Sequence, residues 1–211
     1  MKEYNKIETL FERDMEGTKK LIEGKFRNPA IEFLKDNQWN FTEKIDGTNI
    51  RVYWDGHKVI FGGRTDNAQI PTTLMYALND LFLGITNEEL FEQKFGESTV
   101  TFYGEGYGEK IQKGGGLYKN GVGFILFDVQ VGDTWLERSN VEDIAKSFNL
   151  QVVPIVLTGT IQEAVDYVKS KPKCTIAEQE KEAEGLVGRP IVEMKDRMGN
   201  RVIVKIKVCD F

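Results

Sequence analysis

Residues 43–49 read EKIDGTN, which places a lysine directly before a tight turn. Upstream of the turn, Trp39–Lys44 alternates bulky and polar side chains, which is typical of a β-strand. Thr48–Trp54 is predicted as a second strand, and Asp46-Gly47 is the turn signal between the two, so the pattern predicts a hairpin. A lysine beside a turn is more often solvated than reactive, so the role of Lys44 has to be judged from the other residues in the sequence that could act with it.

Further strands and helices are predicted on both sides of this stretch. The predicted strands are Lys58–Phe61, Thr99–Tyr103 (ending in Gly104-Glu105-Gly106), Gly123–Val131, Val152–Leu157, and Glu184–Glu193 paired with Arg201–Val208 around Gly199-Asn200. The predicted helices are Ile7–Glu23 (weakened by Gly17), Ile31–Lys35, Thr72–Leu83, Asn87–Lys94, Ser139–Phe148 and Thr160–Ser170. Ser139 and Glu142 have the spacing of a capping box. The fold class is therefore α+β with antiparallel hairpins, and the absence of regular βαβ alternation argues against a Rossmann fold.

Length and composition restrict the classes of protein. The 211 residues predict one domain, residues 1–211. No run of about 18 apolar residues exists, so no membrane span or membrane partner is expected, and the amino terminus lacks the apolar core of a secretion signal. Two distant cysteines exclude a disulfide framework and indicate a reducing, cytoplasmic setting. The net charge of -5 argues against a general cationic coat but leaves room for a local basic groove.

Residues that could carry chemistry follow Lys44 in a set order. One arginine comes after the Gly62-Gly63 turn, two glutamates lie at strand ends, and a Phe-Asp pair lies in an apolar strand. Two lysines share one face of the last predicted strand, because strand side chains alternate with period two. Each of these residues, taken alone, could equally be an ordinary solvated or core residue. In chain order they are Arg64, Glu105, Phe127, Asp128, Glu184, Lys205 and Lys207.

Taken in this order, the fragments resemble the nucleotidyl motifs of the covalent nucleotidyltransferase superfamily, which includes DNA ligases, RNA ligases and mRNA capping enzymes. The resemblance covers residues 43–207, nearly the whole chain. It implies an ATP-grasp-like nucleotidyltransferase fold of antiparallel sheets flanked by helices. It also implies that Lys44 is a catalytic nucleophile that attacks the α-phosphate of ATP.

The resemblance assigns a role to each residue type. A lysine amine with a pKa of about 10.4 is protonated at neutral pH, so a nucleophilic lysine needs nearby cations, a metal ion or desolvation. Lys205 and Lys207 are expected to be these catalytic cations and to hold the phosphates of ATP. Glu184 and Asp46 are expected to organise Mg²⁺ (or Mn²⁺), which prefers oxygen ligands and keeps several waters.

The nucleoside end is assigned in the same way. By resemblance, Glu105 would hold the ribose hydroxyls and Phe127 would stack on adenine with its flat apolar face. Glu43 would accept a hydrogen bond from the adenine amino group, which favours ATP over GTP and argues against a capping enzyme. Ile45 is placed with these nucleotide-binding residues.

The local context is most similar to the RNA ligase 2 family. Glu43 directly precedes the lysine, Asn49 follows it by five residues, and Arg64 has the family's spacing. In that family the asparagine and the arginine contact the phosphates of the nucleotide or of the RNA end. The resemblance implies an ATP-dependent RNA ligase that joins 3′-hydroxyl and 5′-phosphate ends through lysyl-AMP and an AMP-capped 5′ end.

Two alternatives remain open: a minimal ATP-dependent DNA ligase, and a non-catalytic nucleic-acid-binding relic of the fold. The chain ends four residues after Lys207, so we expect a monomeric, minimal catalytic domain without an OB-fold. The expected partner is RNA, as a nicked duplex or as RNA ends, with DNA-containing strands as the alternative. A virus-encoded enzyme of this kind would act in the host cytoplasm. Lys110, Lys113 and Lys119 in a glycine-rich loop could follow a phosphate backbone, although solvated loop lysines are commoner.

Overall fold

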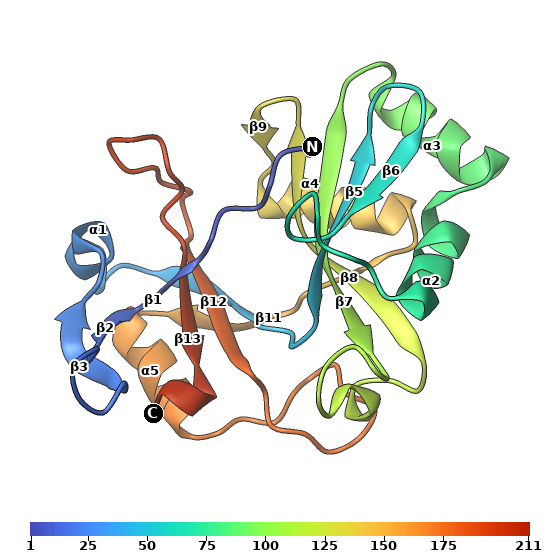
Figure 1. Ribbon diagram of the computed structural model, residues 1–211. Coiled ribbons are helices and arrows are strands. Elements are labelled where there is room, and N and C mark those ends of the chain that lie inside the picture. Colours follow the sequence, from blue (N-terminus) through green and yellow to red (C-terminus); the bar gives the residue numbers. More distant parts are fainter. The chain divides into compact units, whose positions relative to one another are not determined.

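A computed structural model describes all of residues 1–211 (Figure 1). The chain forms two compact units, each assembled from separate segments. Unit 1 consists of Met1–Asn5, Asp46–Val153 and Ala177–Gln179, and unit 2 consists of Lys6–Ile45, Pro154–Ile176 and Glu180–Phe211. Because the segments of the two units alternate along the chain, no single cut separates them, and one domain over residues 1–211 stays a prediction.

Unit 1 is built on a sheet in which β5, β7 and β8 are the long central strands. Neighbouring strands are antiparallel, except that β10 runs parallel to β8. The strand order is β10-β8-β7-β5-β6, with β9 paired to β8. The bounds are β5 Thr48–Trp54, β6 Val59–Gly62, β7 Val100–Gly108, β8 Val122–Val131, β9 Thr134–Trp135 and β10 Gln151–Val152.

Helices supply the other half of the core of unit 1. They are α2 (Thr72–Phe82), α3 (Ile85–Phe95) and α4 (Arg138–Ser147), and a 3₁₀ turn, η1, spans Gly115–Leu117. Their apolar side chains meet those of the sheet in one cluster, where Phe82, Phe91 and Phe102 are fully buried. Phe102 contacts the rings of both other phenylalanines. No helix of the chain combines the length and the apolar character that crossing a membrane requires.

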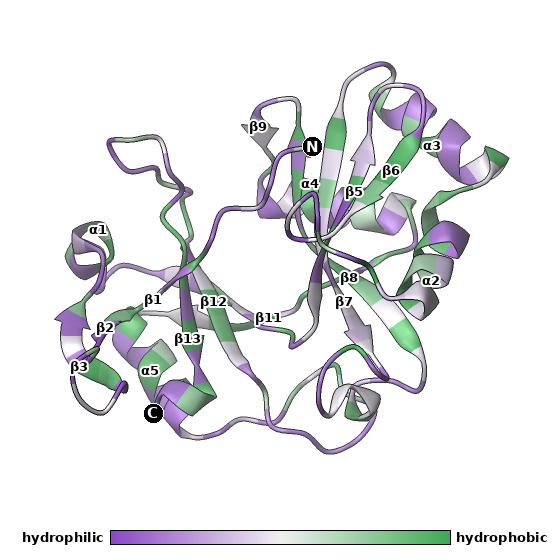
Figure 2. Cartoon of the chain, viewed as in Figure 1, coloured by the Kyte–Doolittle hydropathy of each residue, from purple (hydrophilic) through white to green (hydrophobic).

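Unit 2 contains a second sheet, of order β1-β13-β12-β4-β11, and a separate β2–β3 hairpin. Helix α5 packs on the sheet and contributes Val165 and Val168 to a core with Phe41 and Ile206. Figure 2 shows hydrophobic and hydrophilic residues alternating along α5, as expected of a helix with one buried side. The bounds are β1 Glu8–Thr9, β2 Phe11–Arg13, β3 Leu21–Phe26, α1 Pro29–Phe33, β4 Trp39–Glu43, β11 Ile155–Gly159, α5 Ile161–Lys169, β12 Gly185–Pro190, β13 Val204–Lys207 and η2 Val208–Asp210.

The predicted fold class is confirmed: antiparallel sheets flanked by helices. The hairpin predicted across Asp46-Gly47 is wrong, however. β4 pairs with β12 and β11, whereas β5 pairs with β6 and β7, so the turn carries the chain from one sheet to the other. The backbone at Gly47 comes so close to β7 that a Cβ there would lie 2.2 Å from the carbonyl oxygen of Gly106. The chain does turn at Asp46-Gly47, as predicted. The pairing of the strands on either side of the turn depends on packing between distant parts of the chain.

The helix predicted over Ile7–Glu23 is also wrong, because this region forms β1, β2 and the start of β3. The Asp14 carboxylate accepts hydrogen bonds from the amides of Gly17 and Thr18, and these bonds lower the pKa of Asp14. They form a local turn that competes with helical hydrogen bonding. Of the apolar residues that suggested helical spacing, Leu10 and Phe11 are buried in the core and Leu21 packs against it, whereas Ile22 is 41% exposed.

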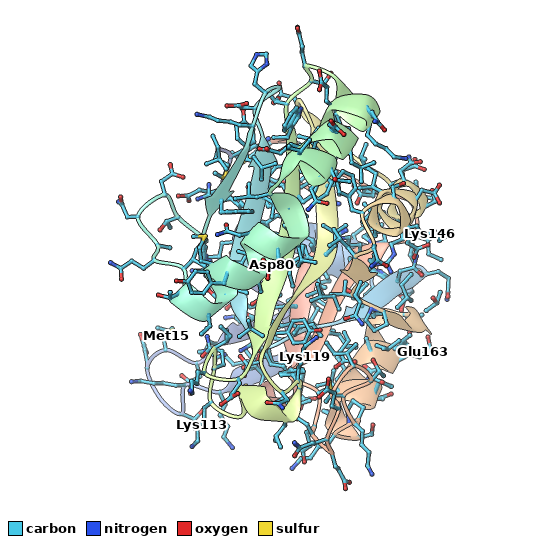
Figure 3. The ribbon with its side chains drawn as sticks, turned by 90° about the vertical axis from the view of Figure 1, so that its right-hand side faces the viewer. Met15, Asp80, Lys113, Lys119, Lys146 and Glu163 are labelled. Carbon is cyan, nitrogen blue, oxygen red and sulfur yellow. The ribbon has the colours of Figure 1, made fainter.

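Three smaller predictions change in the structure. Pro154 divides the predicted strand Val152–Leu157 into β10 and β11. β7 continues to Gly108, so Glu105 lies inside the strand and not at its end. The cap predicted at Ser139 is absent, because α4 begins at Arg138 with Glu137 at its N-cap. The true capping box belongs to α5, where Thr160 and Glu163 bond reciprocally (Figure 3 labels Glu163).

We predict that Phe102→Ala lowers the free energy of unfolding by about 3–5 kcal/mol, because it opens a cavity among buried rings. Phe33→Ala is the matched control, since the same substitution is made at a ring that is 86% exposed. The control should change the free energy by no more than about 0.5 kcal/mol. Urea unfolding measures both, and equal losses would contradict the assignment of Phe102 to the core.

Candidate active site

Three strand ends of unit 2 bring Lys44, Glu184 and Lys207 to one edge of its sheet. Lys44 follows β4, Glu184 precedes β12, and Lys207 ends β13. β12 is antiparallel to both neighbours, so the start of β12 lies beside the ends of β4 and β13. The backbone N–H of Lys44 donates to the carbonyl of Gly185 at 2.9 Å, which continues the ladder and fixes the main chain of the lysine.

The carboxylate of Glu184 joins the two lysines. Its Oε2 accepts from Lys44 Nζ at 2.5 Å, and its Oε1 accepts from Lys207 Nζ at 2.8 Å. The three side chains are 22%, 15% and 30% exposed, in the order Lys44, Glu184, Lys207. Partial shielding from water strengthens such charge-assisted hydrogen bonds relative to those of a solvated pair.

Glu184 also governs the electrostatics of this edge. Burial by itself lowers the pKa of Lys207, but the hydrogen bond and the negative charge of Glu184 outweigh it, so that the pKa is raised. A carboxylate partner favours the charged form of any lysine that it contacts. Lys207 is therefore a cation near Lys44, as expected, but the carboxylate of Glu184 lies between the two lysines.

Lys205 shares a face with Lys207, as the strand pattern predicts. Lys205 lies opposite Val187 on β12, while the intervening Val204 and Ile206 are buried in the core with α5. β13 therefore presents its lysines on the face that α5 does not cover.

Glu43 points to the other face of the same sheet. It lies opposite Leu186, a core residue, and is only 2% exposed. Its Oε2 accepts from the amide of Thr175 at 2.9 Å and from the Thr175 hydroxyl at 2.5 Å, while its Oε1 is buried without a hydrogen-bond partner. The structure thus does not place the Glu43 side chain beside that of Lys44. The adenine contact of Glu43 stays a prediction, and the unpaired Oε1 is the acceptor that such a contact would use.

Unit 1 brings Asn49 and Glu105 together. They are directly opposite each other on β5 and β7, on the face of the sheet that the helices leave uncovered. Asn49 Oδ1 is buried and lacks a hydrogen-bond partner, which is costly unless a donor arrives. The Asn49 oxygen is therefore an acceptor of the kind that a sugar hydroxyl would satisfy.

Phe127 lies next to the amino-terminal segment Met1–Asn5. The Tyr4 ring meets Phe127 edge-on, with ring centroids 5.1 Å apart, and the Tyr4 hydroxyl donates to Asp128 Oδ2 at 2.8 Å. Tyr4 also packs against Tyr103, whose pKa is raised by burial. The sequence pattern did not identify Tyr4, because nothing in an isolated tyrosine near a terminus indicates a contact 124 residues away.

Arg64 is exposed just after β6, on a short loop held by a second arginine. Arg51 is fully buried and donates to the carbonyl of Gly63 at 2.7 Å and to Asp66 Oδ1 at 2.9 Å, so it holds the backbone before Arg64 and a side chain after it. The sequence did carry a signal for Arg51, namely a charged residue within a strand that is otherwise rich in large apolar residues.

The turn after Lys44 is held by side chains from the glycine-rich loop between β7 and β8. The amide of Asp46 donates to the hydroxyl of Tyr118 at 3.1 Å, and Gln112 Nε2 donates to the carbonyl of Gly47 at 3.0 Å. Tyr118 is 1% exposed, and Ile45, the last residue of unit 2 before the turn, is 4% exposed. Sequence analysis missed both Tyr118 and Gln112.

Carboxylate oxygens suited to a divalent cation are present, but they do not form a closed site. No group of three or more His, Cys, Asp and Glu side chains lies together anywhere in the chain. Of the predicted ligands, Glu184 belongs to unit 2 and Asp46 to unit 1. This donor set fits a cation that keeps most of its waters and binds together with phosphates, as Mg²⁺ does, and not one held in an all-protein cage.

We predict a stability contribution from Lys207 that depends on pH. A lysine whose folded-state pKa is raised stabilises the fold below its ordinary pKa of 10.5, and the contribution disappears as the pH rises through the higher folded-state value. Lys207→Met should therefore cost about 1 kcal/mol at pH ~8 and less at pH ~11.5. Urea unfolding at both pH values provides the measurement.

Lys25→Met is the matched control, because Lys25 forms an ion pair with Glu12 in which the side chains are 59% and 43% exposed. Its effect should be small at both pH values, since exposed ion pairs contribute little. A cost for Lys207→Met that did not shrink at high pH would show that lost packing, and not charge, explains the effect.

Comparisons with known proteins identify the family and the fold of this chain. A family model described as RNA ligase matches residues 37–207. No curated protein matches the chain. Among solved structures, one variant of Naegleria gruberi RNA ligase with ATP and Mn shares 20% identity with a TM-score of 0.63, over 85% of this chain and 51% of that one. The same ligase with PPi shares 22% identity with a TM-score of 0.62, over 85% and 52%. At this identity the likeness shows the fold alone, and the chain spans about half the length of these structures.

Proposed function

Because this chain belongs to the RNA ligase family, we propose that it is an ATP-dependent RNA ligase in which Lys44 carries AMP from ATP to an RNA end. The observation that carries the proposal is the junction of Lys44, Glu184 and Lys207 at adjacent strand ends, because it sets a rigidly held amine beside a second cation. Ionisable groups that are clustered and partly shielded from water are typical of catalytic sites, which supports the proposal.

In the first step the Nζ of Lys44 attacks the α-phosphorus of ATP. An N–P bond forms, the P–O bond to pyrophosphate breaks, and the amine gives up its proton. AMP then passes from the lysine to an RNA 5′-phosphate, and a 3′-hydroxyl displaces it to form the new phosphodiester. Positioning and charge neutralisation do most of the work in reactions of this kind.

The contact between Glu184 and Lys44 has to change before the first step. The attacking nitrogen needs a free lone pair, whereas Lys44 Nζ donates a hydrogen bond to Glu184 Oε2. We propose that the triphosphate draws Lys205 and Lys207 toward its own negative charge. Lys44 Nζ must itself leave Glu184 Oε2 before its lone pair can reach the α-phosphorus.

The residues of unit 1 are assigned to the nucleoside and to the RNA end. Phe127 would stack on adenine, Glu105 and Asn49 would bind ribose hydroxyls or phosphate, and Arg64 would bind a phosphate. The cross-strand pairing of Asn49 with Glu105 supports a shared role. The loop that Arg51 holds supports a fixed position for Arg64, since a phosphate contact is only useful if its donor stays in place.

ATP and a divalent cation are part of the proposal. The Naegleria gruberi structures with ATP and Mn, or with AMP and Mn, support both for a protein of this fold. Glu184 and Asp46 are the carboxylates that would hold Mg²⁺ or Mn²⁺. Such a cation supplies neutralisation of phosphate charge and acts as a Lewis acid.

The substrate and setting are also proposed. RNA is the partner that the family indicates, as a nicked duplex or as free ends, and we propose a monomer acting in a cytoplasmic compartment. The minimal DNA ligase alternative and the relic alternative differ from the main proposal in substrate and in AMP transfer, so two assays separate all three.

We predict that the protein becomes labelled when it is incubated with α-³²P-ATP and Mg²⁺, and that Lys44→Arg abolishes the label. Arginine keeps the positive charge but its guanidinium is not a nucleophile at neutral pH. Lys25→Arg is the control, because Lys25 is an exposed lysine outside the site, and it should be labelled like the wild type. The readout is radioactivity that stays on the protein band after denaturing electrophoresis.

A label that survives in Lys44→Arg would place the nucleophile elsewhere. A wild type that binds nicked duplex but is never labelled would support the non-catalytic relic and overturn the proposal.

Sealing of matched nicks distinguishes the two ligase classes. We predict that a nick with a 3′-ribonucleotide end is sealed at least about tenfold faster than one with a 3′-deoxyribonucleotide end, because the 2′-hydroxyl is the group by which a protein distinguishes RNA from DNA. Both substrates carry the same sequence and the same 5′-phosphate, and product is measured by denaturing electrophoresis. Equal rates would favour the DNA ligase alternative.

A further inference from the structure

The loop Glu109–Gly121, between β7 and β8, carries positive charge that the proposed reaction does not use. It contains three lysines and one glutamate in a chain whose net charge is -5. Lys110 and Lys113 are exposed and Lys119 is partly exposed, and Figure 3 shows Lys113 and Lys119 on this loop. The loop is thus a local cationic surface on an acidic protein.

These charges are only weakly neutralised by the protein itself. Lys110 Nζ lies 3.9 Å from Glu109 Oε1, a long contact between side chains that are 83% and 48% exposed. Exposed pairs of this kind contribute little and exchange readily with another anion. No ion pair engages Lys113 or Lys119. The nearby carboxylate of Glu178 accepts a hydrogen bond from the amide of Asn120 at 3.2 Å.

The loop is anchored, so its lysines project from a defined backbone. Tyr118 is buried, and its carbonyl accepts from the amide of Glu178 at 3.0 Å. The carbonyl of Leu117 accepts from the amide of Gln179 at 3.1 Å. Gly115 packs so closely that a Cβ there would lie 1.9 Å from the carbonyl oxygen of Gly108. Anchored lysines lose less conformational entropy when they bind a ligand than lysines on a free loop.

The same loop holds the turn that follows the nucleophile. Tyr118 accepts from the amide of Asp46, and Gln112 donates to the carbonyl of Gly47. Lys44 precedes Asp46 by only two residues, so the chain itself keeps their Cα atoms within about 7 Å. An RNA strand bound along the loop would therefore lie close to the turn that follows the attacking lysine.

We propose that Glu109–Gly121 is the contact for the phosphate backbone of the RNA strand, an inference that rests on the proposed RNA ligase function. Lysine ammonium groups recognise phosphates as point charges without reading bases. The only aromatic ring of the loop, Tyr118, is buried, so the loop offers no surface on which bases could stack. The chemistry therefore fits a phosphate backbone and not unpaired bases.

The test compares two triple variants of equal charge change. The loop variant is Lys110→Gln, Lys113→Gln and Lys119→Gln, and the control is Lys58→Gln, Lys94→Gln and Lys146→Gln, which are exposed lysines of the same unit outside the loop. Lys110 has a positive φ, and glutamine at this position should be no more strained than lysine, because both side chains are unbranched at Cβ. Binding of a fluorescent 5′-phosphorylated RNA, single-stranded or as a nicked duplex, is measured by anisotropy between about 50 and 200 mM salt.

The loop variant should weaken RNA binding roughly 10- to 100-fold at low salt, and the slope of log affinity against log salt should become shallower by about 2 units, at about 0.7 unit per lost phosphate contact. The control should match the wild type. Equal effects of the two triples, or an unchanged slope in the loop variant, would overturn the proposal. Self-adenylylation of each variant with ATP and Mg²⁺ in the absence of RNA is measured in parallel and should be unaffected. Failure of that step in the wild type would count against the ligase function, while the binding data would still decide the role of the loop.

Discussion

The carboxylate of Glu184 is the constraint on which the candidate site depends. A partly buried carboxylate with two partly buried lysines is tolerated only because each oxygen holds one ammonium group. The same pairing ties the ends of β4 and β13 to the start of β12, since their side chains would otherwise leave uncompensated charge at the edge of the sheet. It also means that Lys44 Nζ is held by Glu184 in this structure, and that a polyanion such as a triphosphate would compete with Glu184 for the two lysines.

A second constraint acts on the turn that follows the lysine. Gly47 approaches β7 so closely that no larger residue fits, and Tyr118 and Gln112 hold its backbone polar groups. These backbone groups find their partners in a loop far away in the sequence. The glycine-rich loop therefore connects a cationic surface to the segment that carries the nucleophile. In the same way, Arg51 connects the sheet of unit 1 to the loop that presents Arg64.

Local patterns predicted most of the elements of this fold. The strands around Lys44, the helix after Thr160 and the alternation of Lys205 and Lys207 all follow from side-chain periodicity, which depends only on neighbouring residues. Two predictions were wrong because a single residue overrode the pattern of side chains around it. The Asp14 carboxylate diverted a helix-like pattern into a hairpin, and Pro154 interrupted a run that was otherwise suited to one strand. The hairpin across Asp46-Gly47 was wrong for a different reason, because strand pairing is a long-range choice.

By itself, the sequence determined the chemistry available to this protein: the lysine before its turn, the ordered series of carboxylates, arginine and lysines, and membership of the RNA ligase family. Each of these depends on residue identity and spacing. Only the tertiary structure decided which charges meet. It set Glu184 between two lysines, turned Glu43 to the opposite face and bonded it to Thr175, and set buried Arg51 behind the loop of Arg64. These pairings join residues up to 140 positions apart, and no local rule fixes them, because a buried charge is satisfied by whichever partner the packing of distant strands brings within reach.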